Sequence, residues 1–382
     1  MDRCSVSVAV RAVLPLAFAA GLAAFVIPQP AAHAQITASA EKKGAVEMIK
    51  VHGKSLEGNL EGDSPDRDVF VYLPPSYATN KTRRYPVLYF LHGYGLGAQQ
   101  YWALLTVPDT AERAMGNGTV HETILVFPDA HTIYDGSMYS NSPTTGDWEA
   151  YITHDLVDYI DSHYRTLANR DSRGLAGHSM GGYGTLRLAM KYPEVFSSIY
   201  AMSSCCLMNN PGAPPRPPAR APQAGATPPA QPPAQAQGNG RGGRGGRGGR
   251  GGGFANVFSA EAAAWSPNPQ NPPKFFDLPN ENGAVRPEIA AKWIANSPLA
   301  MVDQYVPNLK MFRAIMMDVG LQDGLAASNQ QMDESLTRLG VPHTFETYEG
   351  DHVNHIKDRF EMRVLPFFSE HLRSTETSAA KR

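Results

Sequence analysis

Apolar positions divide this chain into short runs typical of buried strands and longer periodic stretches typical of amphipathic helices. After the first two strands, runs and helical stretches alternate, which predicts an α/β fold: one mostly parallel sheet with helices on both faces. The stretch from Trp148 to His163 is one predicted helix, and Ile356 to Phe368 is another, with a kink expected at Pro366. The strands are predicted near residues 45–52, 70–75, 86–91, 123–127, 173–178, 197–203, 311–317 and 343–348.

Two segments depart from this alternation. Residues 1–34 hold Arg3 and Arg11, then an apolar stretch from Ala12 to Ile27 and a small-residue cleavage site, which predicts a secretory signal peptide and a secreted or periplasmic protein. Residues 211–253 consist of Pro, Ala and Gln followed by Arg-Gly-Gly repeats, and a disordered spacer is expected because almost no apolar side chain can be buried. Residues 254–297, rich in Pro and aromatics, are interpreted as a lid-like segment of the domain 35–382.

Composition narrows the function classes. The formal net charge is −2, and because the arginines of 211–253 have no acidic neighbours there, the rest of the chain is more acidic. This balance argues against a nucleic-acid-binding surface, and no membrane association is expected. No metal or organic cofactor is predicted, because no His/Cys/Asp cluster has ligand spacing and no phosphate-binding loop is present.

The adjacent cysteines Cys205 and Cys206 follow a predicted strand. A disulfide between neighbouring residues closes a strained ring, so a structural disulfide is not expected. We interpret both as small buried residues, with a redox switch as the less favoured alternative.

The segment Gly177–Gly181, with Ser179 at its centre, has the pattern of a nucleophile elbow. A strand-like run precedes it, and a helical stretch from Tyr183 to Lys191 follows and stops before Pro193. Glycines two positions before and after the serine leave room at a sharp, strained turn. Ser179 is therefore predicted to be a catalytic nucleophile.

An acid and a base occur further along in the order known for α/β-hydrolases, Ser then Asp then His. Asp318 and Asp323 both follow a predicted buried strand, and from the residues alone either is a candidate for the acid. The candidates for the base are His352, in a Gly-x-His loop after the last strand, and His355 nearby.

The apolar run Tyr85–Gly93 ends in His-Gly well upstream of the serine. In α/β-hydrolases the loop after such a strand supplies one N–H of the oxyanion hole, and the residue after the nucleophile supplies the other. The backbone N–H groups of Tyr94 and Met180 are the candidates here.

Taken together, these motifs resemble the esterase D family of α/β-hydrolases, which includes feruloyl and acetyl-xylan esterases, S-formylglutathione hydrolases, enterochelin-type esterases and mycolyltransferases. The resemblance spans most of residues 65–372 and implies an α/β-hydrolase fold with Asp323, rather than Asp318, as the acid. Asn354 stands where many relatives have Trp. The matching pieces are Val71–Tyr77, Tyr85–Gly93, Gly146–Glu149, Leu175–Gly182, Asp318–Asp323 and Gly350–His352.

The resulting hypothesis is an exported serine esterase that uses Ser179, Asp323 and His352 and needs no cofactor. Family resemblance makes feruloyl or acetyl esters of plant cell-wall polysaccharide the leading substrates. An acyltransferase of mycolyltransferase type would use the same triad, and a non-catalytic binding protein on a hydrolase scaffold is the other alternative. The acyl group, the leaving alcohol and the oligomeric state stay open.

Overall fold

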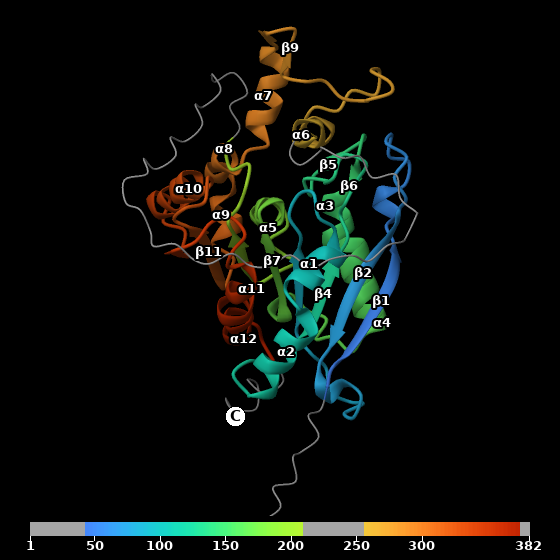
Figure 1. Ribbon diagram of the computed structural model, residues 1–382, viewed down its shortest axis with the longest axis vertical. Coiled ribbons are helices and arrows are strands. Elements are labelled where there is room, and N and C mark those ends of the chain that lie inside the picture. Colours follow the sequence, from blue (N-terminus) through green and yellow to red (C-terminus); the bar gives the residue numbers. More distant parts are fainter. Residues whose placement is uncertain (1–42, 209–255, 375–382) are drawn as a thin grey trace, which may run out of the picture. The chain divides into compact units, whose positions relative to one another are not determined.

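A computed structural model describes residues 43–208 and 256–374 of the chain (Figure 1). The predicted signal peptide and the predicted spacer lie outside these residues. Eight strands form the main sheet: β1 (Ala45–His52), β2 (Asp66–Leu73), β3 (Val87–Leu91), β4 (Ile124–Pro128), β7 (Arg173–His178), β8 (Ser198–Met202), β11 (Ala314–Gly320) and β12 (Thr344–Tyr348).

The order of strands across the sheet is β1-β2-β4-β3-β7-β8-β11-β12. Strand β2 runs antiparallel to both neighbours, and every other adjacent pair is parallel. The prediction of one mostly parallel sheet is confirmed. The predicted strands are present with boundaries shifted by a few residues, the largest consequence being that β11 continues through Asp318 to Gly320.

Both faces of this sheet are buried, as the uninterrupted apolar runs predict. In β3 all five side chains are buried, and they alternate between two separate hydrophobic clusters. Tyr89 and Leu91 belong to one cluster, whereas Leu88 and Phe90 belong to the other. Successive side chains of a strand point to opposite faces, so each cluster marks the core on one side of the sheet.

Helices supply the other half of each cluster. The first cluster contains side chains of α4 (Leu156–His163), α5 (Met180–Lys191) and α10 (Ala326–Arg338). The second contains side chains of α1 (Ala98–Leu104), α2 (Val107–Gly116), α11 (Ile356–Arg359) and α12 (Leu365–His371). Figure 1 shows α1, α2, α11 and α12 grouped together near the sheet.

The two long helices predicted from periodicity each contain a π-helical turn. The first consists of α3 (Trp148–Ala150), the π turn η3 (Tyr151–Asp155) and α4, and the second of α11, the π turn η6 (Phe360–Val364) and α12. Pro366 is the second residue of α12, directly after this π turn, and it has no N–H to donate to the preceding turn. Among the described helices, none is long and apolar enough to cross a membrane.

After the undescribed residues, the chain continues as α6 (Val257–Trp265), a hairpin of β9 (Asn280–Glu281) and β10 (Ala284–Val285), and α7 (Pro287–Ala295). Trp265 packs against Tyr183 of α5, with ring centroids 5.6 Å apart, and against Trp293 of α7 at 5.5 Å. The predicted lid-like segment is therefore attached to α5, the helix that follows Ser179, through buried aromatic side chains. Shorter elements are η1 (Lys54–Leu56), η2 (Pro75–Tyr77), β5 (Asn141–Ser142), β6 (Gly146–Asp147), η4 (Arg170–Ser172), α8 (Pro298–Met301), η5 (Val302–Tyr305) and α9 (Val306–Leu309).

The parallel arrangement decides where chemistry can occur. Five neighbouring strands of the sheet are parallel to one another, in the order β3-β7-β8-β11-β12. Their carboxyl ends therefore lie at one edge, where α/β proteins place their sites. The loops after these strands carry the predicted residues Tyr94, Ser179, Asp323 and His352, together with the cysteine pair.

Candidate active site

Ser179 occupies the turn between β7 and α5 with φ 58° and ψ −113°. This left-handed backbone is unfavourable for a residue with a Cβ and persists because the surroundings enforce it. A Cβ at Gly181 would lie 2.0 Å from the carbonyl oxygen of Leu91, and one at Gly177 would lie 2.4 Å from the Gly181 backbone. The glycines thus allow the nucleophile turn to press against β3, as predicted.

The structure brings Ser179, His352 and Asp323 together. His352 Nε2 lies 2.9 Å from Ser179 Oγ, and His352 Nδ1 lies 2.8 Å from Asp323 Oδ2. Because a carboxylate can only accept, Nδ1 carries the proton and Nε2 is left to accept one from the serine hydroxyl. The Asp323 side chain is 2% exposed and that of His352 is 31% exposed, so the acid is shielded while the imidazole is reachable.

Asp323 is held ionised by its surroundings. Burial alone would raise its pKa, but the hydrogen bonds from His352 and from the Leu325 N–H outweigh that effect, so the pKa of Asp323 is lowered. A carboxylate in this state orients the imidazole and stabilises a positive charge on it.

The rival acid, Asp318, lies elsewhere. Its side chain is fully buried within β11, where Oδ2 accepts hydrogen bonds from Tyr200 Oη at 2.6 Å and Arg359 Nε at 2.9 Å. Burial raises the pKa of Asp318, although Arg359 and Tyr200 lower it. This residue belongs to a buried network between β8, β11 and α11.

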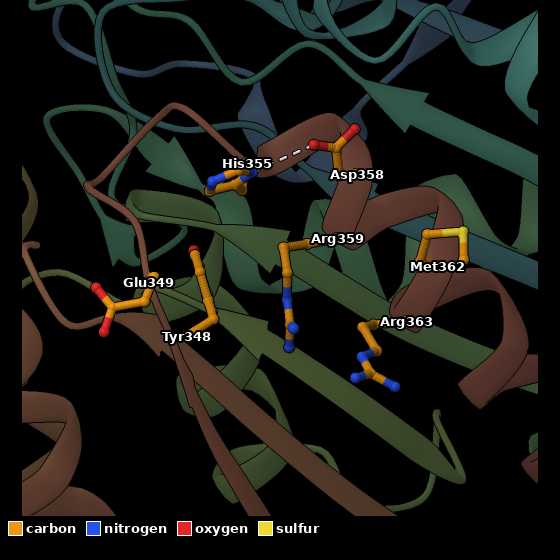
Figure 2. A pocket seen from close by; sticks show the side chains of 7 residues that line it. All are labelled: Tyr348, Glu349, His355, Asp358, Arg359, Met362 and Arg363. Carbon is orange, nitrogen blue, oxygen red and sulfur yellow. Dashed lines mark hydrogen bonds and ion pairs between the residues drawn. The ribbon is translucent and has the colours of Figure 1, made fainter.

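The rival base, His355, has a different set of partners. It lines a surface pocket together with Arg359 and Arg363, and its Nδ1 lies 3.2 Å from Asp358 Oδ2 (Figure 2). Its side chain is 42% exposed. The structure therefore places His352, and not His355, beside Ser179.

Tyr94 and Met180 flank the serine. Met180 begins α5, so its N–H is among those at a helix N-terminus that have no partner within the helix. Tyr94 follows Gly93, whose Cβ would lie 3.3 Å from Ser179 Cβ. Both side chains pack against Gly136, where a Cβ would come within 2.6 Å of Met180 Sδ and 2.9 Å of Tyr94 Cδ2.

His178 is a site residue that the sequence analysis missed. Its ring is buried, with Nε2 2.8 Å from the carbonyl oxygen of His352 and Nδ1 2.9 Å from Tyr101 Oη. Burial lowers the pKa of His178 to about 3, so the ring is neutral. A carbonyl can only accept, so the single N–H is on Nε2, and Nδ1 accepts from the Tyr101 hydroxyl. His178 thereby connects the nucleophile strand to the loop that carries His352.

Glu261 is a second residue that the sequence analysis did not identify. It lies on α6, is 7% exposed, and its Oε1 is 3.5 Å from Cys206 Sγ. Desolvation raises the pKa of Glu261 to about 7, against a smaller opposite effect of Cys206. Burial, Asp135 and Glu261, in that order, raise the pKa of the Tyr94 phenol, so the Glu261 carboxyl lies near enough to this loop to affect its electrostatics.

A metal site would need several ligating side chains close together. Across residues 43–208 and 256–374, no three His, Cys, Asp or Glu side chains converge as ligands of an ion would. The prediction that the chemistry needs no cofactor stays a prediction.

A mostly parallel eight-stranded sheet with a serine at a strained turn between a central strand and a helix defines the α/β-hydrolase class. Residues 64–358 match the family described as "Putative esterase". The chain belongs to this esterase family, and the resemblance noted from its motifs is confirmed.

Curated relatives match a limited part of the chain. It is 35% identical to Esterase Rv1288 of Mycobacterium tuberculosis over 133 residues, which are 34% of this chain and 27% of that protein. It is 31% identical to the S-formylglutathione hydrolase of Paracoccus denitrificans over 147 residues, 35% of this chain and 50% of that enzyme. The match thus spans half or less of these relatives.

Solved structures match over a larger share. A ferulic acid esterase has a TM-score of 0.60 at 21% identity, over 86% of this chain and 99% of that one. The S-formylglutathione hydrolase FrmB of Staphylococcus aureus has a TM-score of 0.54 at 18% identity, over 85% and 99%. These likenesses confirm the α/β-hydrolase fold.

Proposed function

We propose that the protein hydrolyses carboxylic esters through an acyl-enzyme on Ser179. The observation that carries this proposal is the array in which Asp323 Oδ2, His352 and Ser179 Oγ are joined by contacts of 2.8 and 2.9 Å. Membership in the esterase family supports it independently.

In the first half of the reaction, His352 Nε2 takes the Ser179 proton as Oγ attacks the ester carbonyl. Asp323 stabilises the resulting imidazolium, which then gives its proton to the departing alcohol. In the second half, His352 removes a proton from water, whose oxygen attacks the acyl-serine, and the imidazolium then returns the proton to Ser179 Oγ as the acid leaves. The His352 side chain is 31% exposed, which supports access of water to it for this second half.

The oxyanion that forms on the carbonyl needs preorganised donors. The N–H groups of Tyr94 and Met180 are assigned this role, because Met180 begins α5 and Tyr94 follows the glycine that faces Ser179 Cβ. The positive end of the α5 dipole adds to the stabilisation.

Feruloyl or acetyl esters of plant cell-wall polysaccharide are the proposed substrates, and the protein is proposed to act after export and signal cleavage. The support for the substrate is the fold shared with a ferulic acid esterase and with the Clostridium thermocellum feruloyl esterase module complexed with sinapinate (TM-score 0.51). Export rests on the pattern of residues 1–34.

A panel of p-nitrophenyl esters, methyl ferulate, acetylated xylan and S-formylglutathione tests both levels of this proposal. We expect turnover of the small esters and highest kcat/KM for a feruloyl or acetylated polysaccharide substrate. A fluorophosphonate probe should label Ser179 in the wild type and in a Ser204→Ala control, but not in Ser179→Ala. Absence of both labelling and turnover would identify a binding protein, whereas acyl transfer to added sugars in preference to water would identify a transferase.

A further inference from the structure

The adjacent cysteines Cys205 and Cys206 lie at the carboxyl edge of the sheet, three and four residues after the end of β8. Their sulfur atoms are 2.6 Å apart. Both are half-buried, in contrast to the sequence prediction of buried residues, because the chain has left the sheet at this point. We propose that this pair is a redox modification site, at which a disulfide between neighbouring residues forms and lowers activity at Ser179.

The backbone explains why these two thiols meet. Successive side chains of a strand point in opposite directions, which keeps adjacent cysteines apart. Here Cys206 has φ 57°, in the left-handed region that residues with a Cβ rarely occupy. The turn brings both sulfur atoms to the same side, so the two thiols are already in contact before any bond forms.

Neighbouring hydrogen bonds hold this turn in place. On one side, the Ser204 N–H donates to Asn329 Oδ1 at 3.1 Å, and Asn329 Nδ2 donates to the Ser204 carbonyl at 2.9 Å. On the other side, the Leu299 N–H donates to the Leu207 carbonyl at 3.0 Å. Asn329 is fully buried on α10. The conformation that sets the thiols together is therefore maintained by the fold.

Two contacts connect the pair to the proposed active site. The Cys205 N–H donates to the carbonyl oxygen of Ser179 at 3.1 Å, which supports the strained nucleophile turn. The Cys206 thiol donates to Glu261 Oε1 at 3.5 Å. A disulfide reorients the peptide between the two cysteines and removes the thiol donor, so it perturbs both contacts.

The proposed oxidant is hydrogen peroxide, which takes two electrons from the two thiols. The hydrogen bond with Cys205 and desolvation raise the pKa of the Cys206 thiol, which disfavours its thiolate, so the step is written with Cys205 as the attacking thiol. The Cys205 thiolate attacks a peroxide oxygen, forms a sulfenic acid and releases hydroxide, which the thiol proton converts to water. Cys206 sulfur then displaces the sulfenic oxygen as a second water. Two thiols and one peroxide thus give one disulfide and two waters.

The experiment treats the full-length protein with a graded excess of peroxide, alkylates with N-ethylmaleimide, and maps the peptide that contains both cysteines. We expect an unalkylated peptide lighter by two hydrogen atoms, and a parallel fall in kcat/KM of at least about fivefold. Dithiothreitol should restore alkylation and activity together. The effect on kcat/KM rests on the proposed function, whereas the disulfide is measured by mass alone.

Cys205→Ser and Cys206→Ser are the matched variants, since serine keeps the backbone donor and a hydroxyl for Glu261. They should fold with an unchanged melting temperature and keep their activity in peroxide. Loss of activity in both variants that dithiothreitol cannot reverse would point to oxidation of Met180 and overturn the proposal. Two alkylated cysteines after peroxide treatment would overturn it as well. A protein that forms the disulfide but turns over no ester in either state would refute the proposed function instead.

Discussion

Asp323→Asn removes one charge without changing side-chain size, and we expect it to lower kcat by about four orders of magnitude. The asparagine amide can donate to His352 Nδ1, the atom that now lies 2.8 Å from Asp323 Oδ2. The imidazole proton then moves to Nε2, which faces Ser179 Oγ at 2.9 Å and can no longer accept a proton. A neutral hydrogen bond contributes only about 1 kcal/mol, whereas the expected loss corresponds to roughly 5.5 kcal/mol of activation free energy.

Asp318→Asn provides the matched control, because the same chemical change is made five residues earlier in the chain, in a buried network. Its carboxylate accepts from Tyr200 and Arg359, while Arg359 also pairs with Glu346 at 3.0 Å. Arg359 therefore keeps a carboxylate partner, and we expect a loss of stability of about 1–3 kcal/mol. Each kcal/mol lowers the melting temperature of a domain this large by roughly 2–4 °C.

The assay measures kcat for p-nitrophenyl acetate and the melting temperature of each variant. Asp323→Asn should lose activity with little change in melting temperature, and Asp318→Asn should show the reverse. Residual kcat above a tenth of wild type in Asp323→Asn would refute the assignment of the acid. Equal losses of activity and stability in both variants would show that both carboxylates are structural.

Four further predictions use the same preparations. His352→Ala should abolish hydrolysis while His355→Ala stays near wild type, and the opposite pattern would mean that the base has been misassigned. His178→Phe should lower kcat by about 10–100-fold with KM little changed, since it releases the His352 loop, and an unchanged kcat would remove its positioning role. Deleting residues 212–252 should leave the melting temperature and hydrolysis of small soluble esters unchanged, and loss of turnover would make that segment part of the site. Folded Glu261 binds its proton more tightly than the unfolded chain, so this stability is fully present below pH 4.5 and is lost, by roughly 3 kcal/mol, as pH rises through about 7. Urea unfolding at pH 5 and pH 8 should show that Glu261→Gln flattens this slope, and equal slopes in both proteins would contradict it.

Local patterns were sufficient for the parts of the site that local geometry determines. A strained strand-to-helix turn needs small residues at fixed offsets, and Gly177 and Gly181, two residues before and after Ser179, indicate such a turn. Loops after parallel strands meet at one edge, so the position of an Asp or His after a strand also carries information. The same reasoning left Asp318 and Asp323 equivalent, because the predicted strand ended too early. Strand β11 continues to Gly320 and thereby buries Asp318 inside the sheet.

Contacts between distant segments could not be predicted in this way. His178 and the carbonyl oxygen of His352 are 174 residues apart in sequence, and nothing near either position marks the hydrogen bond between them. Glu261 lies on a helix that no periodic pattern connects to the nucleophile. Its raised pKa depends on desolvation, which exists only after α6 has packed.

Three residues with strained backbone follow the strands β7 and β8, at the edge of the sheet that carries the candidate chemistry. Ser179, Ser203 and Cys206 all have positive φ, and each follows one of the two central strands β7 and β8. Each such residue costs of order 1–3 kcal/mol, so it persists only where the surroundings oppose relaxation. The opposing contacts are backbone hydrogen bonds across the edge: the Ser179 N–H donates to the Met202 carbonyl at 2.9 Å, and the Ser203 N–H donates to the Asp318 carbonyl at 2.8 Å. Because hydrogen bonds join these turns, and the Cys205 N–H donates to the Ser179 carbonyl, the proposed bond between the cysteines is expected to change the backbone at the serine.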